Sequence, residues 1–546
     1  MKLKIVFLLI FLGTTSWAQD NNNKIETLIQ VWGFLKYNHP QVATGVVDWD
    51  MEFVEKWQEI QNTTTVDQQN KIYIDWLAKL KTPKPCLECS AVKTTAYAGN
   101  VVLDWINEIP LNDDIKNQLH YILQNRNLGK NYFVQFHQKT QLPLFNNERL
   151  ITSAALPNKS QRILALARYW NAINYFYPYK HLMAVKWQDV LTEMLPDFAS
   201  AASATAYQEC FLKMNKDLAH SSAFIASDLI FDKIGKKKIP FKLEYVDQKW
   251  KVVEFENDSL AHLGSLQLGD EILEVAGKPI QTLVDEYGVW MSNSNPQSLM
   301  VSVAATLLNG VEDQVDLTIR RSGETSKIVQ KRYAVVDFYW DKDKSEADNA
   351  WDIVDDKIIW LKASELDYNQ INAFQAASAT RRYLILDLRD YQLPSGLKLG
   401  DYLVPRSKIF AQMVEPNSRY IGNFNTVPKK NEIPAVKRFF RGTTYVLINE
   451  KTRGQAELLA LLLKGSDRMV TIGSHSSGTL GYLTKIVLPG DVNAFFPGIG
   501  VQNVDGTDIQ QKGIQPDLLL DLGATSDDRK EVIEKILRLV QKTETP

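Results

Sequence analysis

Residue types that could act as nucleophile and base stand together in one short segment, Ser474-His475-Ser476-Ser477. A serine hydroxyl becomes a nucleophile when a histidine within hydrogen-bond reach accepts its proton. Neighbours in a loop usually point apart, however, and no Gly-x-Ser-x-Gly elbow surrounds this segment. Two interpretations stay open: Ser476 or Ser477 attacks with His475 as its base, or the segment is a hydrogen-bonded, serine-rich turn.

Cys86 and Cys89 form a second suggestive pair, with a Cys-x-x-Cys spacing that occurs in metal sites and redox sites. A zinc site needs four ligands, and Cys210 is the only other cysteine. A redox pair should lie between a strand and a helix, whereas Pro83 and Pro85 place this pair in a loop. The sequence therefore favours a local disulfide or two inert thiols, and it predicts no metal site and no cofactor.

Near-continuous apolar runs in the C-terminal part predict the strands that would carry the serine-rich segment. These runs are residues 357–361, 383–388, 443–448 and 469–472. Helices are predicted over 369–377 and 455–464, and a last helix is predicted after a cap at 525–528. Apolar strands flanked by helices are typical of a covered, mainly parallel α/β sheet, which we place at residues 350–541.

Short alternating strands between residues 236 and 335 predict a separate, β-rich module. Inside it, residues 264–280 contain a turn at Gly269 and Asp270, then a strand, then a second glycine turn. This stretch resembles PDZ domains, which capture a C-terminal carboxylate on backbone amides and extend their sheet with the bound peptide. The resemblance implies peptide binding, and we expect Gly269 and Asp270 to contribute to it.

The loop expected to hold the carboxylate departs from the PDZ pattern. It reads Lys237-Lys238-Ile239-Pro240 and contains no glycine, the nearest one being Gly235. Pro240 also supplies no amide donor. Because lysine charge could substitute for the missing amides, two interpretations stay open: a peptide-binding domain, or a structural spacer or lid.

The N-terminal part contains two copies of one helical unit. Residues 32–40 match residues 170–178 at an offset of 138, with Trp, Tyr and Pro at equivalent positions. Two copies make a helical pair rather than a solenoid. We assign residues 19–130 to the first copy, 158–232 to the second and 131–157 to an extended linker. The aromatic stripes of the copies favour helix core, although a non-peptide ligand bound there is a further hypothesis.

The first eighteen residues have the layout of a secretory signal peptide. Two lysines precede the apolar run 5–12, and Ser16 and Ala18 place small residues at −3 and −1 of a cut. The run is too short to span a bilayer, and no cysteine stands directly after it, where a lipid anchor would be attached. We therefore expect an exported protein, periplasmic or secreted, without a stable membrane anchor.

The overall composition argues against some classes of function and favours an ordinary globular protein. The chain of 546 residues carries 62 Lys and Arg against 64 Asp and Glu, a net charge of −2, which argues against a nucleic-acid partner. A hydrophobic content of 45% and a charged content of 23% are ordinary for globular domains. The length allows about three or four such domains.

Six short segments of the α/β region follow one another in a characteristic order after the PDZ-like module. They are residues 386–390, 446–460, 472–478, 488–490, 504–506 and 512–517. Together they resemble the tail-specific, or C-terminal-processing, serine peptidases, including their tricorn-core-like branch. The resemblance implies a crotonase/ClpP-like α/β peptidase core and a cleft that binds peptide or protein C-termini. It also implies a serine nucleophile with a lysine base, or a histidine base in the tricorn-like branch.

Three positions depart from the family pattern. The family nucleophile lies three residues before Glu457, where this chain has Gly454. The family lysine base is expected where the chain has Thr479. The oxyanion-binding glycines after Asp-Leu-Arg are reduced to Gly396, so Gln455, next to the nucleophile position, is the other candidate donor.

The sequence thus predicts an exported family member whose catalytic residues are lost and whose cleft binds chain ends without cutting them. The alternative is an active serine peptidase that uses Ser476 or Ser477 with His475. Because a nucleophile must reach its substrate, a buried Ser477 would argue against this alternative.

Overall fold

The computed structural model of the chain describes residues 23–92, 96–149, 151–339, 350–390, 393–404, 406–430, 439–520, 522 and 529–544. The predicted signal peptide and the predicted cap at 525–528 lie outside these residues. No helix among the described residues is long and apolar enough to cross a membrane. The chain divides into two compact units, each described here by itself.

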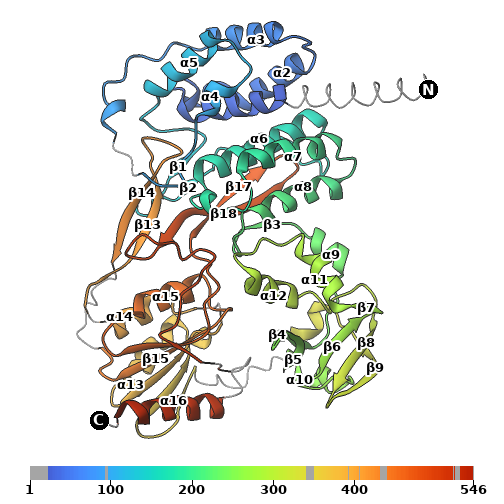
Figure 1. The fold of residues 1–546 in the computed structure, drawn as a ribbon, viewed down its shortest axis with the longest axis vertical. Coiled ribbons are helices and arrows are strands. Elements are labelled where there is room, and N and C mark those ends of the chain that lie inside the picture. Colours follow the sequence, from blue (N-terminus) through green and yellow to red (C-terminus); the bar gives the residue numbers. More distant parts are fainter. Residues whose placement is uncertain are drawn as a thin grey trace, which may run out of the picture. The chain divides into compact units, whose positions relative to one another are not determined.

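Unit 1 contains the N-terminal residues up to 227 and the two later segments 412–427 and 481–501. Residues 23–38 are helical. The helices that follow, drawn in blue to green in Figure 1, are α2 (Trp49–Gln61), α3 (Val66–Lys79), α4 (Trp105–Glu108), α5 (Asp113–Gln124), α6 (Lys159–Phe176), α7 (Trp187–Ser200) and α8 (Ala204–Asp217). The predicted linker 131–157 carries a small hairpin of β1 (Gln135–Phe136) and β2 (Pro143–Leu144).

Reciprocal bonds between two tryptophans hold each copy of the helical unit. In the first copy, the indole of Trp32 donates to Trp49 O (2.8 Å) and the indole of Trp49 donates to Trp32 O (3.0 Å). Trp170 and Trp187 repeat this pair in the second copy, with both bonds at 2.9 Å. All four rings are buried. Buried, hydrogen-bonded indoles of this kind are packing elements, so these tryptophans belong to the helix core.

The Cys86–Cys89 pair is joined by a disulfide, as one of the two sequence interpretations proposed, whereas Cys210 is a free, buried thiol. Such a bond is typical of proteins in oxidising compartments. Within the described part of the chain, no group of three His, Cys, Asp or Glu side chains is placed to hold a metal ion.

A second sheet completes unit 1, with the strand order β14-β13-β18-β17 and β3 paired to β18. Its strands are β3 (Phe224–Ala226), β13 (Ile409–Pro416), β14 (Phe424–Lys430), β17 (Tyr482–Leu488) and β18 (Val492–Gln502). Residues 412–427 and 481–501 lie inside the range predicted for the α/β region. They belong to unit 1 because β18 pairs with β3, which follows the second helical copy.

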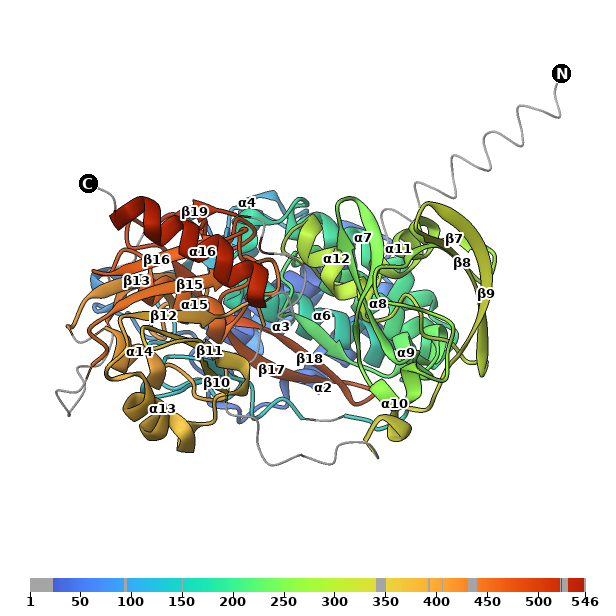
Figure 2. The same ribbon diagram turned by 90° about the horizontal axis from the view of Figure 1, so that it is seen from below.

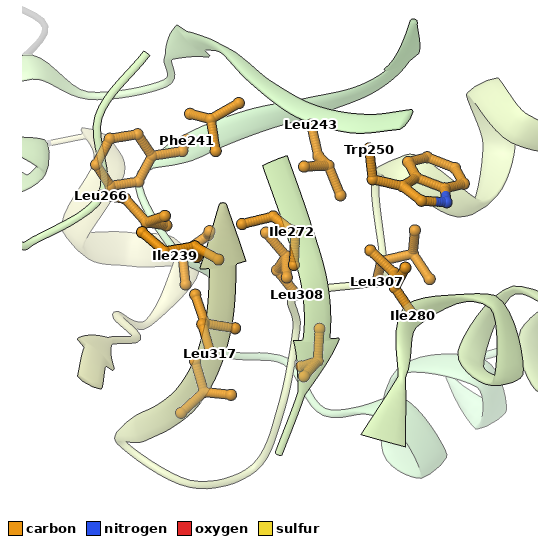
Figure 3. Packing of buried hydrophobic residues seen from close by; sticks show 14 of the residues in the cluster. Ile239, Phe241, Leu243, Trp250, Leu266, Ile272, Ile280, Leu307, Leu308 and Leu317 are labelled. Atoms are coloured by element: carbon orange, nitrogen blue, oxygen red, sulfur yellow. The ribbon is translucent and has the colours of Figure 1, made fainter. Parts of the chain in front are cut away.

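The first part of unit 2 is a small β-rich domain with the strand order β4-β5-β6-β8-β9. Its elements are α9 (Leu229–Ile234), β4 (Phe241–Val246), β5 (Lys249–Phe255), α10 (Asp258–Ala261), β6 (Glu271–Val275), β7 (Lys278–Pro279), α11 (Ile280–Gly288), α12 (Pro296–Ala304), β8 (Gln314–Arg321) and β9 (Glu324–Lys331). Alternate residues of β4, Phe241 and Leu243, pack with Ile272 and Leu317 in its core (Figure 3). Strand β4 is at the edge of the sheet, and α12 packs against it.

The second part of unit 2 is a sheet with the order β10-β11-β12-β15-β16-β19, in which all pairs except β10–β11 are parallel. Its strands are β10 (Trp351–Ile353), β11 (Ile358–Lys362), β12 (Tyr383–Asp387), β15 (Thr443–Ile448), β16 (Met469–Gly473) and β19 (Leu518–Leu519). Its helices are α13 (Ile371–Ser378), α14 (Lys398–Leu403), α15 (Gln455–Leu463) and α16 (Arg529–Glu544), of which α16 covers one face of the sheet (Figure 2). The mainly parallel α/β sheet predicted for this region is confirmed.

Parallel strands bring their carboxyl ends to one edge of a sheet. The turns after β12, β15 and β16 therefore meet there, and these turns, with Gln455 at the start of α15, contain all the candidate catalytic and oxyanion residues.

Candidate functional site

The turn between β15 and α15 is held at the sheet edge by Thr452. Its hydroxyl donates to Leu388 O (2.7 Å) and accepts from Asn449 N (3.0 Å). Its amide donates to Asn449 O (2.9 Å). These bonds tie the turn to the end of β12, so the first residue of the following helix has a fixed position.

Gly454 caps the N-terminus of α15 with φ 60° and ψ −122°, a backbone conformation that L side chains rarely adopt. A Cβ placed on Gly454 would meet no other atom within 4 Å. The helix start also has no side-chain cap, so its first amides are available to stabilise negative charge. The turn thus has the strand–turn–helix form in which peptidases can present a nucleophile. Residue 454 has room for a side chain, but as a glycine it supplies no hydroxyl.

Glu457 organises the next turn and was not among the predicted site residues. It is fully buried and accepts from Gly478 N (2.8 Å), from Thr479 N (2.9 Å) and from the Ser476 hydroxyl. Burial raises the pKa of Glu457 to about 7, although the three donors favour the ionised carboxylate. A single acidic residue within the otherwise apolar stretch of α15 is the sequence signal that could have identified it.

The two predicted substitute nucleophiles are both used as structural hydroxyls. Ser476 donates to Glu457 and accepts from Ile514 N (2.6 Å), and only 2% of it is exposed. Ser477 is also 2% exposed, and its hydroxyl lies 3.1 Å from the Ser298 hydroxyl.

His475, the predicted base, is exposed, and it has no hydrogen-bond partner among the residues that the structure describes. The structure therefore does not bring His475 to either Ser476 or Ser477. The serine-rich segment has the form of the hydrogen-bonded turn that was its other interpretation.

Thr479, at the family base position, is fully buried. Its amide donates to Glu457, and its carbonyl accepts from Gly454 N at 3.4 Å. Its hydroxyl is hydrogen-bonded to the hydroxyl of Ser294, in the loop that precedes α12. The Thr479 hydroxyl is thus held in a hydrogen bond at the position where the sequence analysis expects the base.

Of the two oxyanion candidates, Gly396 and Gln455, the first already uses its amide within its own loop, where it donates to Leu393 O (2.9 Å). Gly396 has φ 56°, and a Cβ placed on it would come 3.9 Å from Gln455 Oε1. The loop after β12 and the Gln455 side chain at the start of α15 therefore lie close together.

A cavity of about 1320 Å³ begins between β4 and α12 and extends to the sheet edge. Its apolar lining includes Phe241, Met300 and Leu308. At its other end it is lined by Lys451 and by Arg453, the residue directly before Gly454. One groove thus extends from the free edge of β4 to the turn that precedes Gly454.

Both walls of this groove are bonded to the turns at the sheet edge. On the β4 side, Glu244 forms an ion pair with Lys451. On the α12 side, the Asn295 side-chain amide donates to Ser477 O and to Gln511 O, both at 3.0 Å. The position of the groove relative to Gly454 is therefore set by direct contacts.

The predicted peptide-binding residues Gly269 and Asp270 do not line this groove. Asp270 is 1% exposed and accepts from Gln267 N (2.8 Å) and from Arg321 Nε (2.7 Å). Gly269 has φ 89°, which the tight turn before β6 requires. The motif is the structural turn of the domain, and the groove lies elsewhere, between β4 and α12.

Comparison with known proteins agrees with this architecture. Residues 235–358 match the family model of the PDZ domain, and residues 360–520 match that of peptidase family S41. No curated protein matches the chain by sequence.

Two solved structures with TM-scores above 0.5 show the same fold. The crystal structure of mature CPAF is similar with a TM-score of 0.54 at 13% identity, over 70% of this chain and 96% of that chain. Mature CPAF complexed with lactacystin gives a TM-score of 0.52 at 14% identity, over 70% and 98%. The photosystem II D1 C-terminal processing protease gives a TM-score of 0.43 at 18% identity, over 69% and 97%. The predicted family resemblance and fold class are confirmed.

Proposed function

From a PDZ domain joined to an S41 peptidase core, we propose that this protein binds the C-terminal ends of polypeptides and does not cleave them by the serine mechanism of the family. The observation that carries the proposal is Gly454. Its turn, its open surroundings and the uncapped helix start are those of a nucleophile position, and the hydroxyl is missing.

The chemistry of the site supports loss of turnover. Removing a nucleophile or its base typically lowers the rate by several orders of magnitude. In this chain both positions are changed, because Gly454 has no side chain and the Thr479 hydroxyl is bonded to Ser294. A threonine hydroxyl is also no general base near neutral pH.

The alternative, an active peptidase based on the serine-rich segment, has less support. A nucleophile must reach the substrate carbonyl, and Ser476 and Ser477 are each 2% exposed with hydroxyls in hydrogen bonds. Ser476 would also have to give up its bond to Glu457 before reacting.

The groove supports peptide binding. Strand β4 pairs with β5 on one side only, so its other edge offers unpaired backbone groups to an extended chain. The cavity beside this edge is lined by apolar side chains of both walls, which can bury the side chains of a bound peptide.

The test compares wild-type protein with Ser476→Ala, Ser477→Ala and Gly454→Ser. A fluorescent tail peptide is expected to bind the wild type and to remain intact, and a fluorophosphonate probe is expected to leave it unlabelled. Gly454→Ser should fold with a loss of about 1–3 kcal/mol from backbone strain.

Ser474→Ala is the matched control, because Ser474 lies in the same segment and its hydroxyl donates to Glu450 (3.0 Å) rather than to Glu457. Wild-type cleavage that disappears in Ser476→Ala or Ser477→Ala, and persists in Ser474→Ala, would overturn the proposal in favour of the active peptidase.

A further inference from the structure

The loop that leads into β4 does not form an open cradle of amides. Lys237 N donates to Gly310 O (3.1 Å), and Lys238 N donates to Tyr333 O (2.9 Å). Pro240 has no amide hydrogen. Within the loop 237–240, this leaves only the amide of Ile239 to bind a ligand. A single amide is a weak site for a carboxylate.

A lysine side chain is present where the amides are missing. Lys238 lines the groove, and a third of its side chain is exposed. Its Nζ lies 3.5 Å from Glu256 Oε1, a long contact for an ion pair. An ammonium group has three donors, so Lys238 can donate to a second carboxylate beside Glu256.

The neighbouring lysines are engaged more closely. Lys237 Nζ lies 2.6 Å from Asp313, and Lys237 does not line the groove. Lys242 lines the groove, but its Nζ lies 2.6 Å from Glu254. Lys238 is therefore the lysine at the start of β4 best placed to receive a ligand.

We propose that the Lys238 ammonium holds the terminal carboxylate of the bound polypeptide in place of the amide cradle, and so sets the direction in which the chain lies. This inference rests on the proposed peptide binding. A chain antiparallel to β4 with its carboxylate at Lys238 runs back toward Glu244, which is bonded to Lys451 near Gly454.

The direction of the bound chain determines how many peptide residues the β4 edge can hold. Lys238 and Glu244 are six positions apart, about 20 Å of extended strand. A peptide of about six residues is thus expected to fill the β4 edge, and only a longer one extends toward Gly454.

The experiment measures binding of a fluorescein-labelled ten-residue peptide with an apolar last residue and a free carboxylate. The same peptide with a C-terminal amide is measured beside it, on full-length wild-type protein, Lys238→Gln and the matched control Lys237→Gln. We expect amidation to weaken wild-type binding roughly five- to tenfold, as for a partly exposed charge-assisted bond. Lys238→Gln should weaken the acid peptide equally and abolish the preference for it, whereas Lys237→Gln should retain the preference.

Two further measurements sharpen the result. Glu256→Gln removes the competing carboxylate and should strengthen binding of the acid peptide, and added salt should weaken the preference for it. Equal wild-type binding of acid and amide would overturn the role of Lys238 while leaving peptide binding in place. A preference that survives Lys238→Gln would overturn it as well. Failure of both peptides to bind the wild type would contradict the proposed function itself.

Discussion

Glu457 is a carboxyl group in surroundings that oppose its charge. It is fully buried on an apolar helix, and its bonds to two amides and one hydroxyl do not offset the loss of water. Its pKa is therefore raised to about 7. The turn after β16 is thus built around a carboxyl group that gains and loses its proton near neutral pH.

Stability is accordingly expected to fall as pH rises. The folded pKa of Glu457 lies above its ordinary value of 4.5, so the folded state retains a proton that the unfolded state has released. The contribution is complete below pH 4.5 and is lost as pH rises through about 7. For the wild type we expect a loss of roughly 3 kcal/mol from this group between these limits, measured by urea unfolding.

Glu457→Gln separates this effect from other titrations. The variant cannot ionise, so the free energy of unfolding should depend less on pH over the same interval. It should also be lower at acidic pH by about 1–3 kcal/mol, because an amide NH₂ would face a donor, Gly478 N or Thr479 N. An unchanged pH dependence in Glu457→Gln would contradict the assignment.

Helix α12 is the element that connects the groove to the turns at the sheet edge. Asn295 caps this helix by accepting from Ser298 N (2.8 Å), and its amide donates to Ser477 O and to Gln511 O. Ser298 adds a hydroxyl bond to Ser477 O (3.1 Å). One side chain therefore both starts the helix and fixes the groove wall to the peptidase core.

Asn295→Ala should consequently affect both stability and binding. Loss of a helix cap typically lowers the free energy of unfolding by about 1 kcal/mol, and two further acceptors lose their donor. We also expect weaker binding of the acid peptide, because α12 is no longer held against the core. Hydrogen exchange of the 474–479 segment should increase in the same variant.

Asn257→Ala is the control for the cap alone. Asn257 caps α10 by accepting from Leu260 N (2.8 Å), and it does not line the groove. It should lose a similar amount of stability and keep the peptide affinity of the wild type. Equal affinities for the two variants would show that the bonds of Asn295 to the core do not position the groove.

At this scale the sequence predicts elements well and their partners poorly. The runs 383–388 and 443–448 are mostly apolar because both faces of their strands are covered, and this pattern is local. The bond of Ser476 to Glu457 joins residues 19 positions apart on different elements. Nothing in the local pattern distinguishes that hydroxyl from a nucleophile, so its structural use could not be predicted.

At the scale of the whole chain, pairing between strands that are distant in the sequence likewise limits what the sequence predicts. Segments 412–427 and 481–501 lie within the predicted α/β region, yet they belong to the unit formed by the helical copies. Strand β18 makes this connection by pairing with β3. The residues of a strand do not show with which other strand it pairs. The domain boundaries predicted from the sequence are therefore continuous in the chain, whereas the compact units combine distant segments through strand pairing.

A buried charge cluster connects the two helical copies within unit 1. Lys36 of the first copy lies 2.5 Å from Glu148, and Arg168 of the second copy lies 3.3 Å from the same carboxylate. Arg168 also lies 2.5 Å from Asp50 of the first copy. The side chains of Lys36 and Arg168 have no exposed surface, and that of Glu148 is 1% exposed. The segment predicted as a linker thus supplies the carboxylate shared by both copies.

Glu148→Gln is therefore expected to destabilise unit 1 strongly. The substitution leaves two buried cations with only Asp50 to balance them, and breaking such a cluster typically costs about 3–5 kcal/mol.

Asp197→Asn is the control, because its pair with Lys213 is about half exposed and should cost less than about 1 kcal/mol. Urea unfolding followed by tryptophan fluorescence measures both variants. Acid-peptide affinity at 25 °C should be unchanged in each, because the groove lies entirely within unit 2. Equal losses of stability in the two variants would show that the shared carboxylate does not hold the copies together.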